Sequence, residues 1–296
     1  MNACISIISS RTKCLPLCLE SLWNSWNNRY NYPVYVHYFD DIYDSEETRK
    51  EITSKTKQTV IFNRVEYKTP PIPEDELYYN RRDLWYVNTG RFTINRKGYL
   101  HMCHFTSNMG ISEDSIELKY DYVLTNDDES GYPVSYDENM FEILKSNNKY
   151  IGALFVGQRL KNGAPHQGHL DTRVGLWDFF KNYVTENNIS PKSTKLQKLL
   201  LDPNGENNYH YLEWCDSYVI NTEMFNLPEW KNWIAAVNNS CGIYKYRWGD
   251  NEIITLFAYM IQEEIFNLGL VESGIHNQGM FRSLQDYAPS VKNINI

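Results

Sequence analysis

Runs of apolar residues alternate with amphipathic and charged segments through the first quarter of the chain. Three segments rich in Ile, Val, Tyr and Phe predict β-strands, at residues 3–9, 33–39 and 59–67. Apolar residues at helical spacing predict a helix after the first strand, at Leu15, Leu19, Leu22 and Trp26. The charged stretch 44–57 is typical of a second, more exposed helix. Strands and helices in this order predict a parallel sheet with right-handed crossovers, and therefore the α/β class.

The remaining pattern continues this alternation to the end of the chain. It predicts strands at residues 120–126, 150–156 and 214–220. It predicts helices at residues 99–111, 174–187, 222–237 and 250–268, with Asp250 as the N-cap of the last helix. The stretch 69–96 is rich in Pro, then in Tyr and Arg, and indicates a long surface excursion. Because we find no repeat and no low-complexity linker, we expect a single domain over residues 1–296.

Polar residues follow the first two predicted strands. In open parallel sheets, ligands bind beyond the carboxyl ends of the strands. The tip Ser9-Ser10-Arg11 and the tip Asp40-Asp41 are therefore candidate ligand-binding segments.

The segment YDYVLTNDDE ends a predicted strand with three acidic residues, Asp127, Asp128 and Glu129. Because side chains alternate along a strand, we expect Asp127 and Glu129 on one side and Asp128 on the other. Carboxylates at a strand end suit hard divalent metals, and a metal there can neutralise a diphosphate. The alternative interpretation is a solvated acidic turn.

Composition narrows the classes of function. A formal net charge of −8 over 296 residues disfavours nucleic-acid binding, which needs clustered Lys and Arg. An aromatic content of 15% suggests ring-lined surfaces of the kind that stack sugars. The sequence shows neither a run of about 20 apolar residues nor a signal-peptide pattern, so we expect a cytoplasmic or otherwise soluble chain with no signal peptide or membrane anchor in these residues. The six cysteines lack paired metal-site spacing, so we expect reduced thiols.

Three motifs, taken together in this order, resemble the fungal α-1,2-mannosyltransferases of glycosyltransferase family 15. They are GYLHMCHF at residues 98–105, the acidic strand end, and YRWGD at residues 246–250. The family carries a Tyr-Arg-His-Met-Cys-Arg helix, a Trp-Arg-x-Glu-Pro strand end and a Glu-Arg-Trp-Gly-Asp turn. The resemblance extends over nearly the whole chain.

This resemblance implies a GT-A fold with a Rossmann-like nucleotide-binding half, expected at residues 1–130, and an acceptor-binding half at residues 131–296. It also implies a GDP-mannose donor, a manganese ion, retention of anomeric configuration, and a glycan or glycoprotein acceptor. The stretch 157–209 matches the family poorly outside Leu176-Trp177-Asp178, and such loops usually shape acceptor pockets.

Metal and donor ligands follow from the resemblance residue by residue. Asp127 stands where the family has a metal-binding Glu, and His276 stands where it has a late metal-binding His. Asp128 replaces the family's Pro, so it is expected near the donor, and Glu129 is expected as an additional metal ligand. Arg11 matches an Arg after the first strand, and its charged fork suits a diphosphate or a base edge.

Candidate catalytic residues follow in the same way. Tyr99 corresponds to a family Tyr near the donor phosphates, and Asp250 matches the aspartate of the Trp-Gly-Asp turn, with an expected role in orienting the acceptor hydroxyl or the sugar. Tyr218 stands at the family's candidate nucleophile, a Glu, and a phenol with an ordinary pKa near 10 is a poor substitute. Asp216 is the nearest carboxylate on the same side of the strand. We therefore expect front-face transfer without a covalent intermediate.

Two further hypotheses remain open. The first keeps the chemistry and changes the donor to a UDP-sugar such as UDP-glucose or UDP-xylose. The second is a non-catalytic carbohydrate-binding protein, which the Tyr218 substitution permits.

Overall fold

The central element of the fold is a seven-stranded sheet. The structure is a computed structural model that describes residues 1–80, 96–112, 115–132, 135–154, 160–161, 164–165, 173–205, 212 and 217–268. Within these residues the sheet has the order β3-β2-β1-β4-β8-β5-β9. Its strands are β1 (Ala3–Ile8), β2 (Val34–Tyr38), β3 (Val60–Arg64), β4 (Tyr122–Asp127), β5 (Ile151–Ala153), β8 (Tyr218–Asn221) and β9 (Phe266–Asn267). Two short strands, β6 (Leu160–Lys161) and β7 (Ala164–Pro165), pair separately.

The first four strands run parallel, which confirms the α/β class and the mostly parallel sheet. β1 pairs in parallel with both β2 and β4, and β2 pairs in parallel with β3. β8 runs antiparallel to β4 and to β5, and β9 runs parallel to β5. Ile8 lies opposite Asp127 in the register of β1 and β4. The tip after β1 and the acidic turn after β4 therefore lie side by side.

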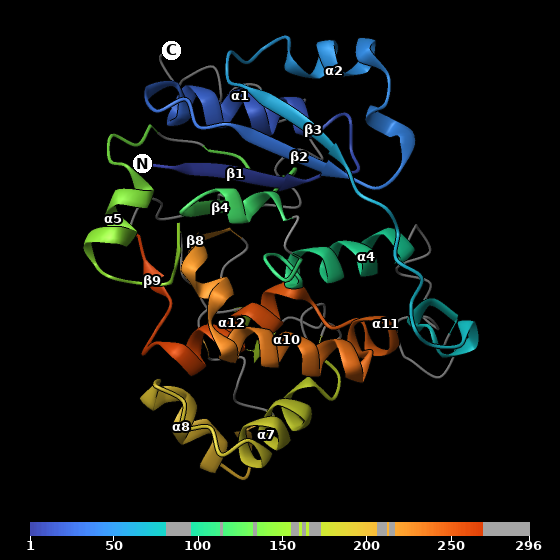
Figure 1. The fold of residues 1–296 in the computed structure, drawn as a ribbon, viewed down its shortest axis with the longest axis vertical. Helices are drawn as coiled ribbons and strands as arrows, with labels where there is room; N and C mark the ends of the chain where they lie inside the picture. Colours follow the sequence, from blue (N-terminus) through green and yellow to red (C-terminus); the bar gives the residue numbers. More distant parts are fainter. Residues whose placement is uncertain are drawn as a thin grey trace.

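Helices cover the sheet and build the second half of the molecule (Figure 1). They are α1 (Leu15–Ser25), α2 (Glu46–Thr53), α4 (Arg96–Ser107), α5 (Met140–Ser146), α7 (Leu176–Glu186), α8 (Thr194–Leu201), α10 (Pro228–Ser240), α11 (Gly242–Tyr246) and α12 (Asp250–Ile261). In Figure 1, α1 and α2 lie beside β1–β3, α4 lies between the strands and α10–α12, and α7 and α8 form the opposite end. None of the helices in the described ranges has the length and hydrophobicity to cross a membrane.

Side-chain alternation divides the core between the two faces of the sheet. Ile5 and Ile7 of β1 belong to a cluster with α1, whereas Cys4 belongs to a cluster with α4, α10 and α12. β4 follows the same rule, because Leu124 joins the α1 cluster and Val123 joins the other. Asp127 shares the parity of Val123, which directs it toward the face that α4 and α12 cover.

The first two helices confirm their predicted patterns. The four apolar residues that predicted α1 are all fully buried. α2 buries only Ile52, and Ser45 caps it by accepting a hydrogen bond from the amide of Thr48. The apolar spacing therefore predicted the packed helix α1 correctly, and the charged stretch predicted the surface helix α2 correctly.

Two predicted helices differ in their ends. The segment predicted as a helix over 222–237 starts as a 3-10 helix (Thr222–Asn226), and α10 begins only at Pro228, which is favoured in a first helical turn. The helix predicted over 250–268 ends at Ile261, because the chain then turns and residues 266–267 pair with β5. The predicted N-cap is also wrong, since Gly249 takes that position and Asp250 is the first helical residue.

Other predicted boundaries differ from the observed ones by a few residues, or lie partly outside the described residues. The helix predicted over 99–111 spans 96–107. The strands predicted over 150–156 and 214–220 are described only in part, as β5 and β8. Sequence reasoning missed α5 and α8, although Asn139 and Ser193 before them are N-caps that accept backbone hydrogen bonds.

Candidate active site

A pocket lies at the carboxyl end of the parallel strands, between the sheet, α4 and the first turn of α12. Its polar lining comes from Ser6, Thr106, Thr125, Asn126, Asp127, Tyr218, Asp250 and Asn251, and its apolar lining comes from Ile8, Phe105 and Met109. Three predicted site residues, Asp127, Tyr218 and Asp250, therefore converge here from separate parts of the chain. Two of them are carboxylates, one on the sheet side and one on the helix side.

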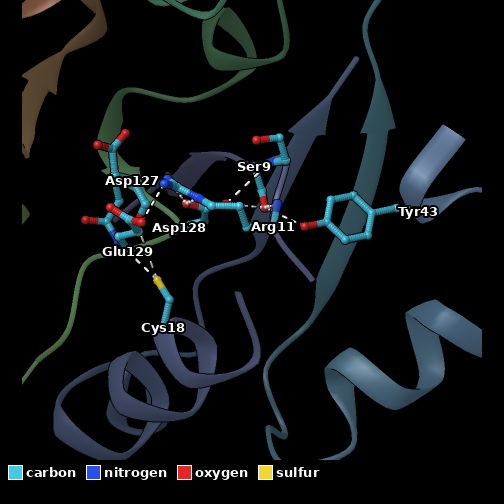
Figure 2. Close-up of polar contacts among 9 residues, drawn as sticks. Ser9, Arg11, Cys18, Tyr43, Asp127, Asp128 and Glu129 are labelled. Atoms are coloured by element: carbon cyan, nitrogen blue, oxygen red, sulfur yellow. Dashed lines mark hydrogen bonds and ion pairs between the residues drawn. The ribbon is translucent and has the colours of Figure 1, made fainter. Parts of the chain in front are cut away.

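The acidic segment after β4 forms a turn rather than an extension of the strand. The amide of Ser130 donates to the carbonyl of Asp127 at 3.0 Å, so Asp128 and Glu129 are the two central residues of the turn. The Asp127 side chain lines the pocket, and Figure 2 shows it pointing away from Cys18 and α1. Asp128 is fully buried on the other side, as the alternation predicts.

Glu129 departs from the expected alternation, and Arg11 explains the departure. The Arg11 guanidinium lies between Asp128 and Glu129 and forms an ion pair with each (Figure 2). The expectation that Glu129 shares a side with Asp127 is wrong, because the chain turns at Asp128 and the pleat does not continue. Burial would lower the pKa of Arg11, but the hydrogen bond and charges of Asp128 and Glu129 outweigh it and raise that pKa. Arg11 stays charged, and its contacts here are to protein carboxylates.

The second candidate tip, Asp40-Asp41, follows β2 and is exposed to solvent. Asp40 accepts a hydrogen bond from the Tyr67 hydroxyl at 3.0 Å, and the Tyr67 ring stacks on Phe39 at 4.9 Å between centroids. Burial, followed by the hydrogen bond and charge of Asp40, raises the pKa of Tyr67 to about 12. Asp41 starts a 3-10 helix (Asp41–Tyr43) whose last residue, Tyr43, reaches back to the tip of β1.

On the helix side, Tyr99 of α4 contacts the YRWGD motif. Arg247 adopts a left-handed backbone conformation, with a φ of 62°, and its guanidinium lies 4.2 Å from the centre of the Tyr99 ring. Burial raises the pKa of Tyr99 well above its ordinary value, and it does the same for Cys103 one turn along the helix. Both groups are therefore neutral. Tyr99 can donate a hydrogen bond but cannot act as a base.

Tyr218 is a buried residue whose hydroxyl contacts α12. Its side chain is 1% exposed, and its hydroxyl donates to the carbonyl of Asn251 at 3.2 Å. The hydroxyl of Thr255 lies 3.1 Å away and can donate to the phenol oxygen. These contacts attach β8 to the first turns of α12. The phenol oxygen is thereby held by hydrogen bonds within the protein.

A buried acid that sequence reasoning missed lies beneath the sheet side of the pocket. Glu117 accepts hydrogen bonds from Ser6 at 2.9 Å and from Ser115 at 2.6 Å, and His37 lies 3.2 Å away. Burial would raise the pKa of Glu117, but the hydrogen bond and charge of His37 and the Ser115 hydroxyl outweigh it and lower that pKa to about 2. No local pattern links residues from three distant segments, so only the fold could show this group.

Two predicted residues, Asp216 and His276, lie outside the described residues. Within the described ranges, no three metal-binding side chains of His, Cys, Asp or Glu converge. The chemistry of Asp127 still fits a divalent ion, because hard cations at phosphate sites are often held by one or two carboxylates with substrate phosphates and water completing the shell. Arg11 compensates one of the three acidic charges of the turn through its contacts with Asp128 and Glu129, and Asp127 lines the pocket.

Solved structures with the same architecture define the fold class. Core-mannan synthase A from Aspergillus fumigatus, in an Mn/GDP form, superimposes with a TM-score of 0.72 at 18% identity, covering 89% of this chain and 71% of that one. The mannosyltransferase Ktr4p from S. cerevisiae, in complex with GDP, superimposes with a TM-score of 0.67 at 16% identity, covering 88% of this chain and 66% of that one. The fold is that of the GT-A glycosyltransferases.

The family follows from the sequence. The model of the glycolipid 2-alpha-mannosyltransferase family matches residues 1–268, and the chain belongs to this family, glycosyltransferase family 15. A probable mannosyltransferase, MNT3, from Candida albicans is 27% identical over 169 residues, which is 57% of this chain. The match spans 41% of that relative's length, so this chain corresponds to part of it.

Proposed function

We propose that this chain is a manganese-dependent, retaining mannosyltransferase that moves mannose from GDP-mannose to a hydroxyl of a glycan acceptor. The observation that carries the proposal is the convergence of Asp127 and Asp250 on one pocket at the carboxyl end of a parallel sheet. Family membership supports the reaction class, and the Mn/GDP and GDP forms of the two structural relatives support the donor and the metal. In this proposal, residues 1–130 bind the nucleotide and residues 131–296 bind the acceptor.

Asp127 is the protein ligand for the metal in the described part of the chain, with His276 as a second proposed ligand. A bound divalent ion supplies charge neutralisation for the leaving diphosphate. Arg11 forms ion pairs with Asp128 and Glu129. We therefore assign the positive charge at the diphosphate to the metal ion and not to Arg11. The exposed Asp40 and Asp41 lie at the same strand ends and are proposed to face the nucleoside.

The arrangement of Tyr218 supports front-face transfer. Although Tyr218 lines the pocket, its phenol oxygen is held by hydrogen bonds to α12 and is not activated for attack. In the proposed step, the acceptor oxygen bonds to the anomeric carbon on the face from which the diphosphate leaves. The bond between that carbon and the phosphate oxygen breaks, and the acceptor proton passes to the departing phosphate oxygen.

Asp250 is proposed to orient the acceptor hydroxyl or the donor sugar. It lines the pocket from the first turn of α12, where the helix dipole favours a carboxylate. Tyr99 and Cys103 are neutral neighbours on α4, and they leave Asp250 as the acidic group on this side of the pocket within the described residues. Asp216 would have a catalytic role only if a covalent sugar adduct formed.

Thermal shift and turnover test the proposal together. The protein is incubated with GDP or UDP, each with and without Mn²⁺, and its melting temperature is measured. A ligand that binds only the folded state raises this temperature. We expect GDP with Mn²⁺ to stabilise the protein more than either alone. Turnover of GDP-mannose with a mannoside acceptor is then followed, and the anomeric configuration of the product is read by NMR.

Each other outcome would favour a different hypothesis. Stabilisation by UDP instead of GDP would replace the donor and keep the reaction class. Glycan binding without any response to nucleotide or Mn²⁺ would favour a non-catalytic carbohydrate-binding protein. A sugar adduct of the intact protein, detected by mass spectrometry and mapped to Asp216, would overturn front-face transfer.

A further inference from the structure

Asp128 is an unusual acid for a ligand-binding turn, because its carboxylate is completely enclosed by protein donors. Its relative exposure is 0%, and it accepts hydrogen bonds from the Ser9 hydroxyl at 2.7 Å and from the Ser10 amide at 3.3 Å. Arg11 donates to it through Nε at 2.9 Å and through Nη2. A carboxylate with this many donors has no capacity left for a nucleotide or a metal ion.

These hydrogen bonds join three strand ends into one unit. Ser9 has a single hydroxyl proton and donates it to Asp128, so the Tyr43 hydroxyl, 2.6 Å away, donates to Ser9. Asp128 belongs to the turn after β4, Ser9 follows β1, and Tyr43 belongs to the 3-10 helix after β2. Figure 2 shows this chain of contacts running from Tyr43 through Ser9 to Asp128, with Arg11 over the carboxylate.

The same turn carries the pocket carboxylate. Asp127 is its first residue, and the backbone carbonyl of Asp127 is fixed by the Ser130 amide at 3.0 Å and contacted by the Cys18 thiol at 3.6 Å. Pro is favoured at the second position of such a turn, where it restricts the backbone. An aspartate imposes no such restriction, so in this chain the side-chain contacts of Asp128 restrict the backbone of the turn instead.

We propose that Asp128 is a positioning residue that fixes Asp127 toward the pocket, with Ser9 and Arg11 as its anchors, rather than a donor ligand. This inference rests on the proposed function, because it assigns Asp127 to the metal. Groups that hold a metal ligand in place typically change metal affinity or activity by about 10–100-fold when they are removed. Loss of Asp128 should therefore weaken Mn²⁺ binding although Asp128 itself does not touch the ion.

Three variants test the inference in the full chain. Asp128→Asn keeps the size and removes the charge, and Ser9→Ala removes one anchor without changing the charge. Asp137→Asn is the matched control, because Asp137 pairs with Arg29 at 2.9 Å on an exposed surface and its loss changes the net charge equally. The first measurement is the Mn²⁺ concentration for half-maximal thermal stabilisation at fixed GDP. The second is hydrogen exchange of the Ser10 amide without ligands.

We expect Asp128→Asn to need about tenfold more Mn²⁺ and Ser9→Ala to need a few-fold more, with Asp137→Asn unchanged. Exchange of the Ser10 amide should accelerate in Asp128→Asn and stay protected in the control. If Asp128 only stabilised the fold, its substitution would lower the melting temperature of the free protein and leave the Mn²⁺ midpoint unchanged.

The outcomes separate the two proposals. A wild-type protein that ignores Mn²⁺ and GDP would overturn the proposed function, and the inference with it. A wild-type response that Asp128→Asn reproduces at the same Mn²⁺ concentration would overturn the inference alone. If Asp128→Asn does not fold, Ser9→Ala decides, and an unchanged Mn²⁺ midpoint in that variant overturns the inference.

Discussion

Buried ionisable groups differ in charge between the two sides of the pocket. On the sheet side, Glu117 stays charged because His37 and two hydroxyls hold its carboxylate, and Arg11 stays charged between two acids. On the helix side, burial keeps the phenol of Tyr99 and the thiol of Cys103 neutral. A charged group survives burial where enough partners reach it, as Glu117 shows, whereas the burial of Tyr99 outweighs the opposing charge of Arg247.

The difference bears directly on the proposed reaction. A leaving diphosphate needs positive charge, and the sheet side offers Asp127 as the carboxylate that would hold a cation there. A sugar needs a shaped surface with few ionised groups, and the helix side offers that, with Asp250 as its carboxylate.

Asp127→Asn should have the largest effect, because it removes the pocket carboxylate and keeps its size. We expect turnover of GDP-mannose to fall about 10³-fold, equivalent to roughly 4 kcal/mol. Stability without ligands should change by less than about 1 kcal/mol. The checks are steady-state kinetics and the Mn²⁺-dependent melting shift. Asp121→Asn, an exposed change just before the same strand, is the control. Equal activity of both variants would remove Asp127 from the site.

The pH dependence of stability should separate the two sides. The pKa of Glu117 falls from 4.5 to about 2 on folding, so its contribution is complete above pH 4.5 and is lost as the pH falls toward 2. The loss should be on the order of 3 kcal/mol. On α4, burial, followed by the charges of Lys68 and His101, lowers the pKa of His104 from 6.5 to about 4. Its contribution is complete above pH 6.5 and is lost as the pH falls toward 4.

Urea unfolding at a series of pH values tests both steps. Glu117→Gln should remove the lower step and leave the upper one, and His104→Gln should do the reverse. The same acid-induced loss of stability in both variants and in the wild-type protein would show that neither group governs it.

Asp250→Asn should lower kcat about 100-fold, or roughly 2.7 kcal/mol, while the affinity for GDP stays within a few-fold. The reason is that Asp250 is assigned to the sugar or the acceptor and not to the nucleotide. Kinetics and a GDP titration by calorimetry measure the two effects. Asp178→Asn is a matched control, because Asp178 is also an acid in the first turn of a helix, α7, and it is exposed. A large loss of GDP affinity in Asp250→Asn would contradict this assignment.

Tyr218→Phe should have the smallest effect on activity. It removes one buried hydroxyl with partners on α12, which should cost about 1 kcal/mol of unfolding free energy. Turnover should stay within about fivefold, since the phenol takes no part in the proposed step. Tyr120→Phe is the control for the stability cost. It removes a hydroxyl that lies 2.7 Å from the Tyr35 hydroxyl, and this pair is not part of the pocket lining. Abolished turnover in Tyr218→Phe with normal stability would restore Tyr218 as a reacting group.

Local patterns predicted the parallel half of the fold well. The spacing of Leu15, Leu19 and Leu22 fixed α1, and β-branched and aromatic runs fixed β1–β3. β9 has two residues and shows no periodicity, so only its pairing with β5 defines it. Asp127 and Asp250 were identified by motif, and the fold brings them to one pocket.

The contacts of the acidic turn could not be predicted in the same way. Strand alternation placed Asp127 and Asp128 correctly, but it does not apply after the chain turns, so Glu129 was misplaced. The partner of Asp128 and Glu129 is Arg11, more than a hundred residues earlier in the chain. No local pattern carries information over such a separation.

That separation has a consequence for how the protein folds. The bonds between Arg11 and Asp128 close a loop of 117 residues, and the entropy of closing it must be overcome before they form. We expect β1 and β4 to pair before these bonds form, because contacts between distant segments form slowly. The pocket carboxylate should then acquire its final orientation late in folding, and metal affinity measured during refolding should report the closed sheet rather than the earlier helices.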